Sequence, residues 1–141
     1  MKTSMLICLA TAISVQAQTF SDIPCPVNAK RVVIIGGGAA AIAAAETAQH
    51  NGWQAIIVDP RNHVAGMMAA SNHSWLLNGS TGESIPRPEG TVKKELFARG
   101  MDSGAYPLLL SHCAGLLVMD NRVTGVAIAS KFGTFIMEAD A

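Results

Sequence analysis

One short segment limits the fold of this chain more than any other. The run RVVIIG at residues 31–36 is followed by Gly37, Gly38 and an alanine-rich tract. A short, continuous apolar run is typical of a strand that is buried on both faces of a parallel sheet. Consecutive glycines permit a tight turn out of such a strand, and alanine favours the helix that follows. The segment therefore predicts strand, turn and helix in direct succession, which is how an α/β unit begins.

The residues that follow complete a βαβ unit. The tract from Ala39 to Asn51 has helix composition, and Gly52 is a suitable residue to end it. The run QAIIVD at 54–59 predicts a second buried strand, which ends in an acid. Strand, helix and strand together take up roughly thirty residues, the usual size of this motif. We therefore predict a Rossmann-like core with a parallel sheet.

The second half of the chain predicts a different arrangement. Residues 60–91 are rich in Gly, Ser, Asn and Pro and predict mostly loop, with a short helical turn at 66–70 before a helix at 91–101. Three apolar runs separated by turn residues then predict consecutive antiparallel hairpins at 106–120, 122–130 and 133–141. The predicted fold class is α/β, a Rossmann-like βαβ core followed by a C-terminal antiparallel three-stranded sheet. Because the chain ends inside the last predicted strand, we expect this fold to be incomplete.

The glycine turn fits the pattern G-x-G-x-x-G/A, with Gly36, Gly38 and Ala41 at the fixed positions. The first glycine permits the tight turn, the second lets the backbone approach a pyrophosphate, and a small third residue lets helix and strand pack closely. The anion lies on free N–H groups at the N-terminus of the helix, where the macrodipole favours negative charge. Glycine–alanine tracts also occur in tightly packed helices, so the pattern gains its weight from its place between a buried strand and a helix.

An acid follows at the spacing that this pattern requires. Asp59 ends the second predicted strand 21 residues after Gly38, close to the separation at which an acid binds the ribose hydroxyls of a dinucleotide. An acid there disfavours the 2′-phosphate of NADP. The alternative is a βαβ unit with a tight turn and an incidental acid. NAD and FAD both carry an ADP moiety, so these residues alone do not distinguish the two cofactors.

The N-terminus has the pattern of an export signal. Lys2 precedes an apolar run from Met5 to Val15, and Val15-Gln16-Ala17 fits the small-x-small rule for cleavage. The run is shorter than the roughly 20 apolar residues of a transmembrane helix. We predict a signal peptide at residues 1–17, cleavage after Ala17, and a secreted or periplasmic protein with an extended lead-in at 18–30. The alternative is a buried N-terminal helix.

The composition narrows the range of partners. The 141 residues include ten basic and ten acidic side chains, which gives no reason to expect nucleic acid as a partner. The four histidines show no metal-ligand spacing, and we interpret His63 and His73 as surface imidazoles, with a role in proton transfer as the alternative. We expect a small-molecule substrate, no nucleic acid, no metal and no membrane span in the mature chain.

Around and after Asp59 the sequence resembles a known family. The stretch IIVDPRNHVAGMMAAS at 56–71 is similar to the segment of FAD-dependent oxidoreductases that reads, in general form, an acid, a basic residue and then G-G-M-A. In that comparison Asp59 and Arg61 take the positions of the acid and the basic residue. Gly66-Met67 falls on a second glycine turn, which in the family passes the pyrophosphate and the flavin. Ala65 stands where the family has the first of its two glycines.

Residues 88–141 resemble the helix, strand and hairpins of the same family, especially its exported bacterial members. One family strand contacts the adenine through its backbone, and Cys113 falls on that position. The family form continues into a strand with an A-T-G-type motif, and the chain ends at Ala141, just before it. The domain that the resemblance implies is an FAD-binding one at 31–141, truncated at its C-terminus. Its predicted cofactor-binding residues are Gly36, Gly37, Gly38, Ala39, Ala40, Ala41, Asp59, Pro60, Arg61, Gly66, Met67 and Cys113.

The resemblance implies an FAD-dependent oxidoreductase that transfers hydride from a small organic substrate to the flavin. The sequence identifies neither that substrate nor the catalytic residues. One alternative is a non-catalytic or truncated nucleotide-binding fragment, which would need a partner chain or a missing C-terminal region. A second alternative is an NAD-binding module, which the Gly66 turn disfavours.

Overall fold

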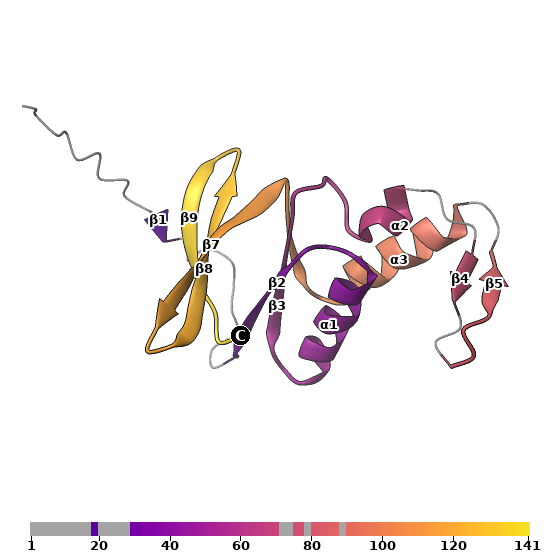
Figure 1. The fold of residues 1–141 in the computed structure, drawn as a ribbon, viewed down its shortest axis with the longest axis horizontal. Coiled ribbons are helices and arrows are strands. Elements are labelled where there is room, and N and C mark those ends of the chain that lie inside the picture. The colour runs from indigo at the N-terminus through magenta and orange to yellow at the C-terminus, as the bar shows by residue number, and fades with distance from the viewer. Residues whose placement is uncertain (1–17, 20–28, 71–74, 78–79, 88–89) are drawn as a thin grey trace, which may run out of the picture.

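The computed structural model describes residues 18–19, 29–70, 75–77, 80–87 and 90–141, so the predicted signal peptide lies outside the described residues. Most of the described elements form three layers (Figure 1), an antiparallel sheet, a parallel sheet and a layer of helices. The parallel sheet lies in the middle. This is the predicted combination of a Rossmann-like core with a C-terminal antiparallel sheet, and the fold class is confirmed.

The parallel sheet contains the two strands of the predicted βαβ unit and one more. Its strands are β2 (Arg31–Ile35), β3 (Gln54–Asp59) and β6 (Tyr106–Leu109), in the order β2-β3-β6. All neighbours in this sheet are parallel. Five of the six residues of β3 are buried, as expected for a central strand that is covered on both faces.

Helix α1 (Ala39–His50) covers one face of the parallel sheet. Its Ala45 packs in one cluster with Ala55 and Ile57 of β3. Small alanine side chains let the helix axis approach the sheet closely, which is why an alanine-rich sequence suits this position.

The antiparallel sheet covers the other face. It consists of β7 (Ser111–Met119), β8 (Arg122–Ser130) and β9 (Gly133–Glu138), with the two-residue β1 (Gln18–Thr19) parallel to β9. Ile56 and Val58 of β3, whose side chains alternate with Ala55 and Ile57, pack here. The main core cluster lies between the two sheets and contains Ile56, Val58, Val126, Ile128, Phe135 and Met137.

The prediction of a single strand at 106–120 is wrong. The chain leaves the parallel sheet after Leu109 and enters the antiparallel sheet at Ser111, with Leu110 between them at a φ of 53°. A left-handed backbone at a leucine is uncommon, and nothing in the apolar run predicts a turn at this point. The three antiparallel strands are therefore confirmed, but the first of them starts five residues later than predicted (111 instead of 106).

The segment between β3 and β6 contains more secondary structure than predicted. The short helix α2 (Gly66–Ala70) is confirmed, and α3 (Thr91–Asp102) follows where a helix was expected. Residues 60–91 were predicted to be mostly loop, but they also contain an antiparallel pair, β4 (Trp75–Leu77) and β5 (Ser84–Pro86). No helix among the described residues is long and apolar enough to span a membrane.

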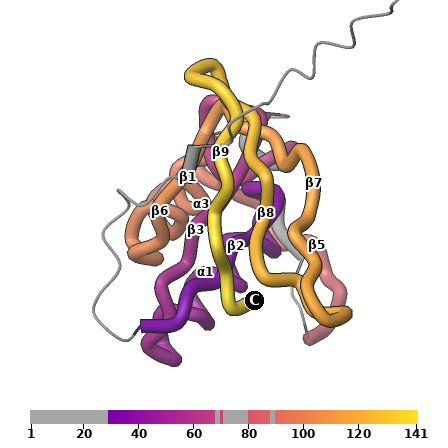
Figure 2. The backbone as a smooth tube through the Cα atoms, turned by 90° about the vertical axis from the view of Figure 1, so that its left-hand side faces the viewer, coloured from indigo at the N-terminus to yellow at the C-terminus, as the bar shows by residue number. Residues whose placement is uncertain are grey.

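The last three residues do not continue β9, which ends at Glu138 rather than at 141. Ala139 still donates to the carbonyl of Thr124 on β8, and the chain then turns to the outer edge of β2, where Ala141 donates to the carbonyl of Arg31 at 3.3 Å and accepts from the amide of Val33 at 2.9 Å. This pair of bonds is the pattern of a parallel bridge. Figure 2 shows the C-terminus beside β2.

Candidate functional site

The site begins at the carboxyl end of β2, where the chain turns into α1. The amide of Gly36 donates to the carbonyl of Val58 at 2.8 Å, and Gly36 has a φ of 103°, a conformation that favours glycine. The amide of Gly37 donates to Oδ2 of Asp59 at 2.5 Å. A Cβ added at Gly37 would lie 2.8 Å from that oxygen, so the middle position of the pattern also requires glycine. The glycine pattern alone does not predict that requirement, because it leaves this position open.

Gly38 is the N-cap of α1 and faces open space. Its φ of −74° and ψ of −178° are available to any residue, and a Cβ placed on it would meet nothing within 4 Å. The first amides of a helix have no acceptor within the helix, and here no acid occupies the first turn. The missing side chain of Gly38 therefore leaves room for a ligand directly in front of these donors, which is what a dinucleotide phosphate needs.

Asp59 lies at the neighbouring strand end and is 1% exposed. Its Oδ1 accepts from the backbone amide of Arg61 at 2.7 Å, while its Oδ2 accepts from Gly37. The guanidinium of Arg61 lies 3.6 Å from Oδ2. Each carboxylate oxygen has two lone pairs, so after binding the two amides the oxygens of Asp59 can still accept further hydrogen bonds. The side chain of Arg61 lies beside Oδ2.

The second glycine turn packs against the first. The amide of Ala65 donates to the carbonyl of Gly37 at 2.6 Å. A Cβ added at Gly66 would lie 3.1 Å from the Cα of Gly38 and 2.9 Å from Nη1 of Arg61. Ala65 and Gly66 both have positive φ angles, of 79° and 56°. The two segments that the sequence singled out are therefore joined at one place, with alanine in the position where the family has a glycine.

His63 is half-buried, with one ring nitrogen enclosed by protein. Its Nε2 is buried and has no hydrogen-bond partner, while its Nδ1 lies 2.8 Å from Oδ1 of Asn62. The burial of Nε2 depends on how the loop between β3 and α2 folds, and no local sequence pattern predicts it. His73 lies outside the described residues.

The remaining predicted residues fall in different surroundings. Ala39, Ala40 and Ala41 form the first turn of α1. Pro60 and Met67 are exposed, Met67 to 69%. Cys113 lies on β7 and packs against the core between the two sheets, with Sγ 3.6 Å from the carbonyl of Gly115. Its side chain therefore packs in the core, and only its backbone atoms are available to contact a ligand.

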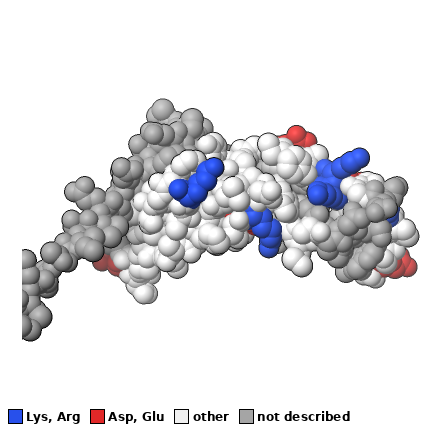
Figure 3. Space-filling view, turned by 90° about the horizontal axis from the view of Figure 1, so that it is seen from above, with Lys and Arg blue, Asp and Glu red and all other residues white. Residues whose placement is uncertain are grey.

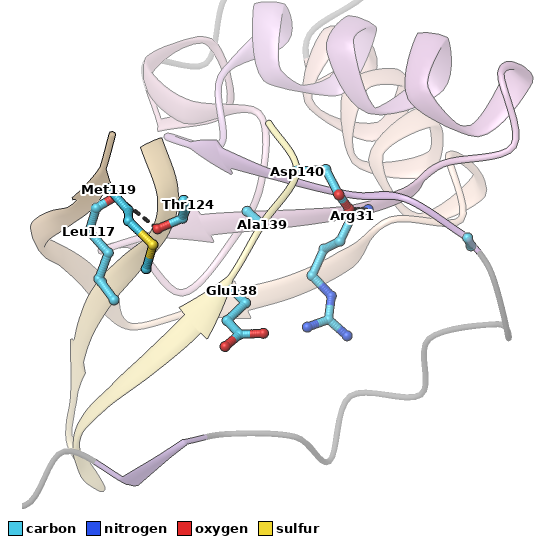
Figure 4. A pocket seen from close by; sticks show the side chains of 8 residues that line it. Arg31, Leu117, Met119, Thr124, Glu138, Ala139 and Asp140 are labelled. Carbon is cyan, nitrogen blue, oxygen red and sulfur yellow. Dashed lines mark hydrogen bonds between the residues drawn. The ribbon is translucent and has the colours of Figure 1, made fainter. Parts of the chain in front are cut away.

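A pocket of about 430 Å³ lies elsewhere, at the amino end of β2 (Figure 4). Its polar groups bond largely to protein atoms. Arg31 donates from Nε to Oε1 of Gln54 at 3.1 Å and from its backbone amide to Asp140, and Thr124 donates to the carbonyl of Leu117. Because Arg31 begins the strand that Gly36 follows, the pocket and the glycine turns lie at opposite ends of β2, and we do not assign the pocket to the site. Its lining residues are Ala29, Arg31, Leu117, Met119, Thr124, Glu138, Ala139 and Asp140.

Charged side chains are sparse on one face of the described residues. Figure 3 shows uncharged side chains over most of the described part of that face. One ion pair joins α1 to α3, where Arg99 donates to both carboxylate oxygens of Glu46 at 3.0 and 2.6 Å. This hydrogen bonding lowers the pKa of Glu46 and raises the pKa of Arg99. Within the described residues, no group of three or more His, Cys, Asp or Glu side chains could hold a metal ion.

Known proteins match this chain at the level of family and fold. A family model described as FAD dependent oxidoreductase matches residues 31–107, which is more than half of the 141 residues. No curated protein matches the chain in sequence.

Three solved structures share the fold. A geranylgeranyl bacteriochlorophyll reductase-like protein from Thermoplasma acidophilum has a TM-score of 0.56 at 16% identity, over 79% of this chain and 37% of that one. THI4 from Thermovibrio ammonificans has a TM-score of 0.57 at 15% identity, over 78% and 54%. L-proline dehydrogenase from P. horikoshii has a TM-score of 0.56 at 18% identity, over 86% and 24%. The chain thus spans from about a quarter to about half of the length of these proteins.

Proposed function

Since the chain belongs to the family of FAD-dependent oxidoreductases, and FAD is therefore its cofactor, we propose that it binds FAD across the two glycine turns and takes part in hydride transfer from a small organic substrate. The observation that carries this proposal is the close approach of Gly66 to Gly38, where a Cβ on Gly66 would lie only 3.1 Å from the Cα of Gly38. It brings two backbone turns together in front of the helix N-terminus, where both can approach a diphosphate.

Most of the predicted residues receive a role in this proposal. The amides of the first turn of α1, from Ala39 to Ala41, hold the pyrophosphate, because they have no acceptor within the helix. Gly38 admits the phosphate, because a Cβ there would fill the space in front of those amides.

At the adenosine end, Asp59 binds ribose hydroxyls with the lone pairs that Gly37 and Arg61 leave free. Because Asp59 is 1% exposed, the side chain of Arg61 has to move aside when the ribose binds. The backbone of Cys113 contacts the adenine, and Gly66-Met67 borders the flavin side.

FAD supplies the redox chemistry when it is bound, and the protein binds, orients and tunes it. The described residues of this chain provide the adenosine and diphosphate part of such a site. The proposal specifies the substrate only by its class, a small organic hydride donor, and names no residues that face it. We further propose that the protein acts after export, because residues 1–17 have the pattern of a signal peptide.

The direct test is calorimetric titration of the purified protein with FAD, NAD and FMN. We expect FAD to bind, NAD to bind more weakly through its ADP moiety, and FMN, which lacks that moiety, not to bind. Absence of FAD binding would contradict the site assignment. Anaerobic mixing of the FAD-loaded protein with candidate organic donors then tests the reaction, because reduction removes the visible absorbance of the flavin. Binding of FAD without reduction by any donor would favour a non-catalytic nucleotide-binding protein.

A further inference from the structure

The pocket at the amino end of β2 is lined by two opposite charges that do not pair with each other. Arg31 bonds to Gln54 through Nε, and its two terminal Nη atoms make no hydrogen bond or ion pair with any described residue. Glu138 lines the same pocket, and its carboxylate likewise bonds to no described residue. Figure 4 shows both charged ends pointing away from the strands that carry them. The pocket therefore offers a ligand one cation and one anion that the described part of the chain leaves unused.

The backbone around these two groups is held by hydrogen bonds. The amide of Asp140 donates to the carbonyl of Arg31 at 2.9 Å, and the amide of Arg31 donates to Oδ2 of Asp140 at 2.8 Å. The amide of Ala139 donates to the carbonyl of Thr124 at 3.0 Å, which ties the residue after Glu138 to β8. Because Nε of Arg31 already donates to Gln54 at 3.1 Å, a ligand meets the guanidinium at its Nη end. Two parallel N–H donors there match the two oxygens of a carboxylate.

The other lining residues restrict the ligand further. Asp140 adds a second carboxylate, so the pocket carries two acids and one guanidinium. A ligand that is only an anion meets more repulsion than attraction there, and a ligand that is only a cation leaves Arg31 without a partner. Leu117 and Met119 of β7 supply apolar surface to the same pocket. The ligand that satisfies all of these groups carries a carboxylate, an ammonium group and an apolar part.

We propose that this pocket binds a small zwitterion, an amino acid or a short peptide with an apolar side chain. Its carboxylate binds the Nη atoms of Arg31, its ammonium group binds Glu138, and its apolar side chain contacts Leu117 and Met119. The volume of about 430 Å³ lies in the range of small-molecule sites. Because the pocket and the glycine turns lie at opposite ends of β2, this ligand is distinct from the hydride donor, and the inference does not rest on the proposed function.

The first test titrates the unaltered, isotope-labelled protein with three probes in NMR. L-leucine carries both charges, 4-methylpentanoate is the same skeleton without the ammonium group, and 3-methylbutylamine is the same skeleton without the carboxylate. We expect leucine to shift the amide resonances of Arg31 and Asp140 and the methyl resonance of Met119. Each analogue should bind about tenfold more weakly or worse, because it loses a charged hydrogen bond. Leucyl-leucine, titrated in parallel, decides between an amino acid and a peptide. An analogue that binds as tightly as leucine, or the absence of these shifts with both leucine and leucyl-leucine, would overturn the proposal.

The second test assigns each charge to its residue. Glu138→Gln should weaken leucine binding about tenfold or more without weakening 4-methylpentanoate, and Arg31→Gln should weaken leucine without weakening 3-methylbutylamine. The matched controls are Asp102→Asn and Arg122→Gln, since both residues are exposed and neither lines the pocket. Unchanged leucine affinity in Glu138→Gln, or an equal loss in the control variants, would overturn the assignment. A protein that binds FAD but neither leucine nor leucyl-leucine would overturn this inference alone and leave the proposed function intact.

Discussion

The backbone amide of Gly37 donates a hydrogen bond to Oδ2 of Asp59, 22 residues further along the chain. Gly37 lies in the turn that follows β2, and Asp59 ends β3, so the bond joins the carboxyl ends of two adjacent parallel strands. Ligands of open α/β sheets bind outside these carboxyl ends. One buried carboxylate therefore fixes the two strand ends that would hold the dinucleotide.

Replacing Asp59 by Asn should destabilise the protein. An Asn side chain has one carbonyl oxygen and one NH₂ group, so it cannot accept from both Gly37 and Arg61, and one backbone amide would face another donor. We expect a loss of about 1–3 kcal/mol in the free energy of unfolding, measured by urea denaturation. Asp102→Asn is the matched control, because Asp102 is exposed at the end of α3. Equal stability of the Asp59→Asn and control variants would contradict the structural role of the carboxylate.

Two adjacent glycines should respond in opposite ways to the same substitution. Gly38→Ala should leave the folded protein as stable as before, because the backbone conformation is ordinary and the Cβ meets nothing within 4 Å, yet it should weaken FAD binding by filling the diphosphate space. Gly37→Ala should lower the thermal midpoint, because its Cβ would lie 2.8 Å from Oδ2 of Asp59. Calorimetry and thermal unfolding separate the two effects. Gly115→Ala, where a Cβ is also unopposed, should change neither quantity, and full FAD affinity in Gly38→Ala would exclude this turn as the diphosphate site.

The sequence predicts the βαβ core well because its signals there are local. In β3, Ala55 and Ile57 face α1, whereas Ile56 and Val58 face the antiparallel sheet. A strand of this kind has no polar face, so a continuous apolar run is its direct consequence. The turn after β2 is equally predictable, since the first glycine of the pattern, Gly36, has the positive φ that favours glycine.

What the sequence did not predict depends on contacts between distant residues. The break at Leu110 is a left-handed residue inside an apolar run, and the amide of Leu110 bonds to the carbonyl of Arg61 in another loop. The burial of Nε2 of His63 likewise follows from the fold of its loop, which is tied to the glycine turn through Ala65. The glycine pattern leaves residue 37 unconstrained, and only the position of Asp59 beside it in the fold shows that glycine is required there.

The ion pair between α1 and α3 should give part of the stability a dependence on pH. The hydrogen bonds from Arg99 lower the pKa of Glu46 in the folded protein, so the pair contributes fully above the ordinary carboxyl pKa and is lost as pH falls through the lowered one. An NMR titration of the Glu46 carboxyl carbon measures this directly. Arg99→Gln should return the pKa of Glu46 toward its ordinary value. An identical titration curve in Arg99→Gln would show that the pair does not persist in solution.

Export should remove the first 17 residues. When the gene is expressed in a bacterium, we expect the exported protein to begin at Gln18, as measured by intact mass, because Ala17 ends a small-x-small site. Ala17→Arg should block cleavage at this bond and leave the precursor with the cells. An exported protein that retains residues 1–17 would instead favour the alternative of an N-terminal helix that stays part of the fold.

Gly125 should be the least replaceable glycine of the antiparallel sheet. It lies on β8 opposite Glu138 of β9, and a Cβ there would lie 2.6 Å from the carbonyl oxygen of Met137. Because that atom belongs to the backbone of the neighbouring strand, no rotamer change can relieve the overlap, and the two strands would have to separate. We expect Gly125→Ala to lower the free energy of unfolding by about 1–3 kcal/mol, measured by urea denaturation. Gly115→Ala on β7 provides the comparison, since its Cβ is unopposed, and equal stability of the two variants would mean that β8 and β9 are not paired in this register.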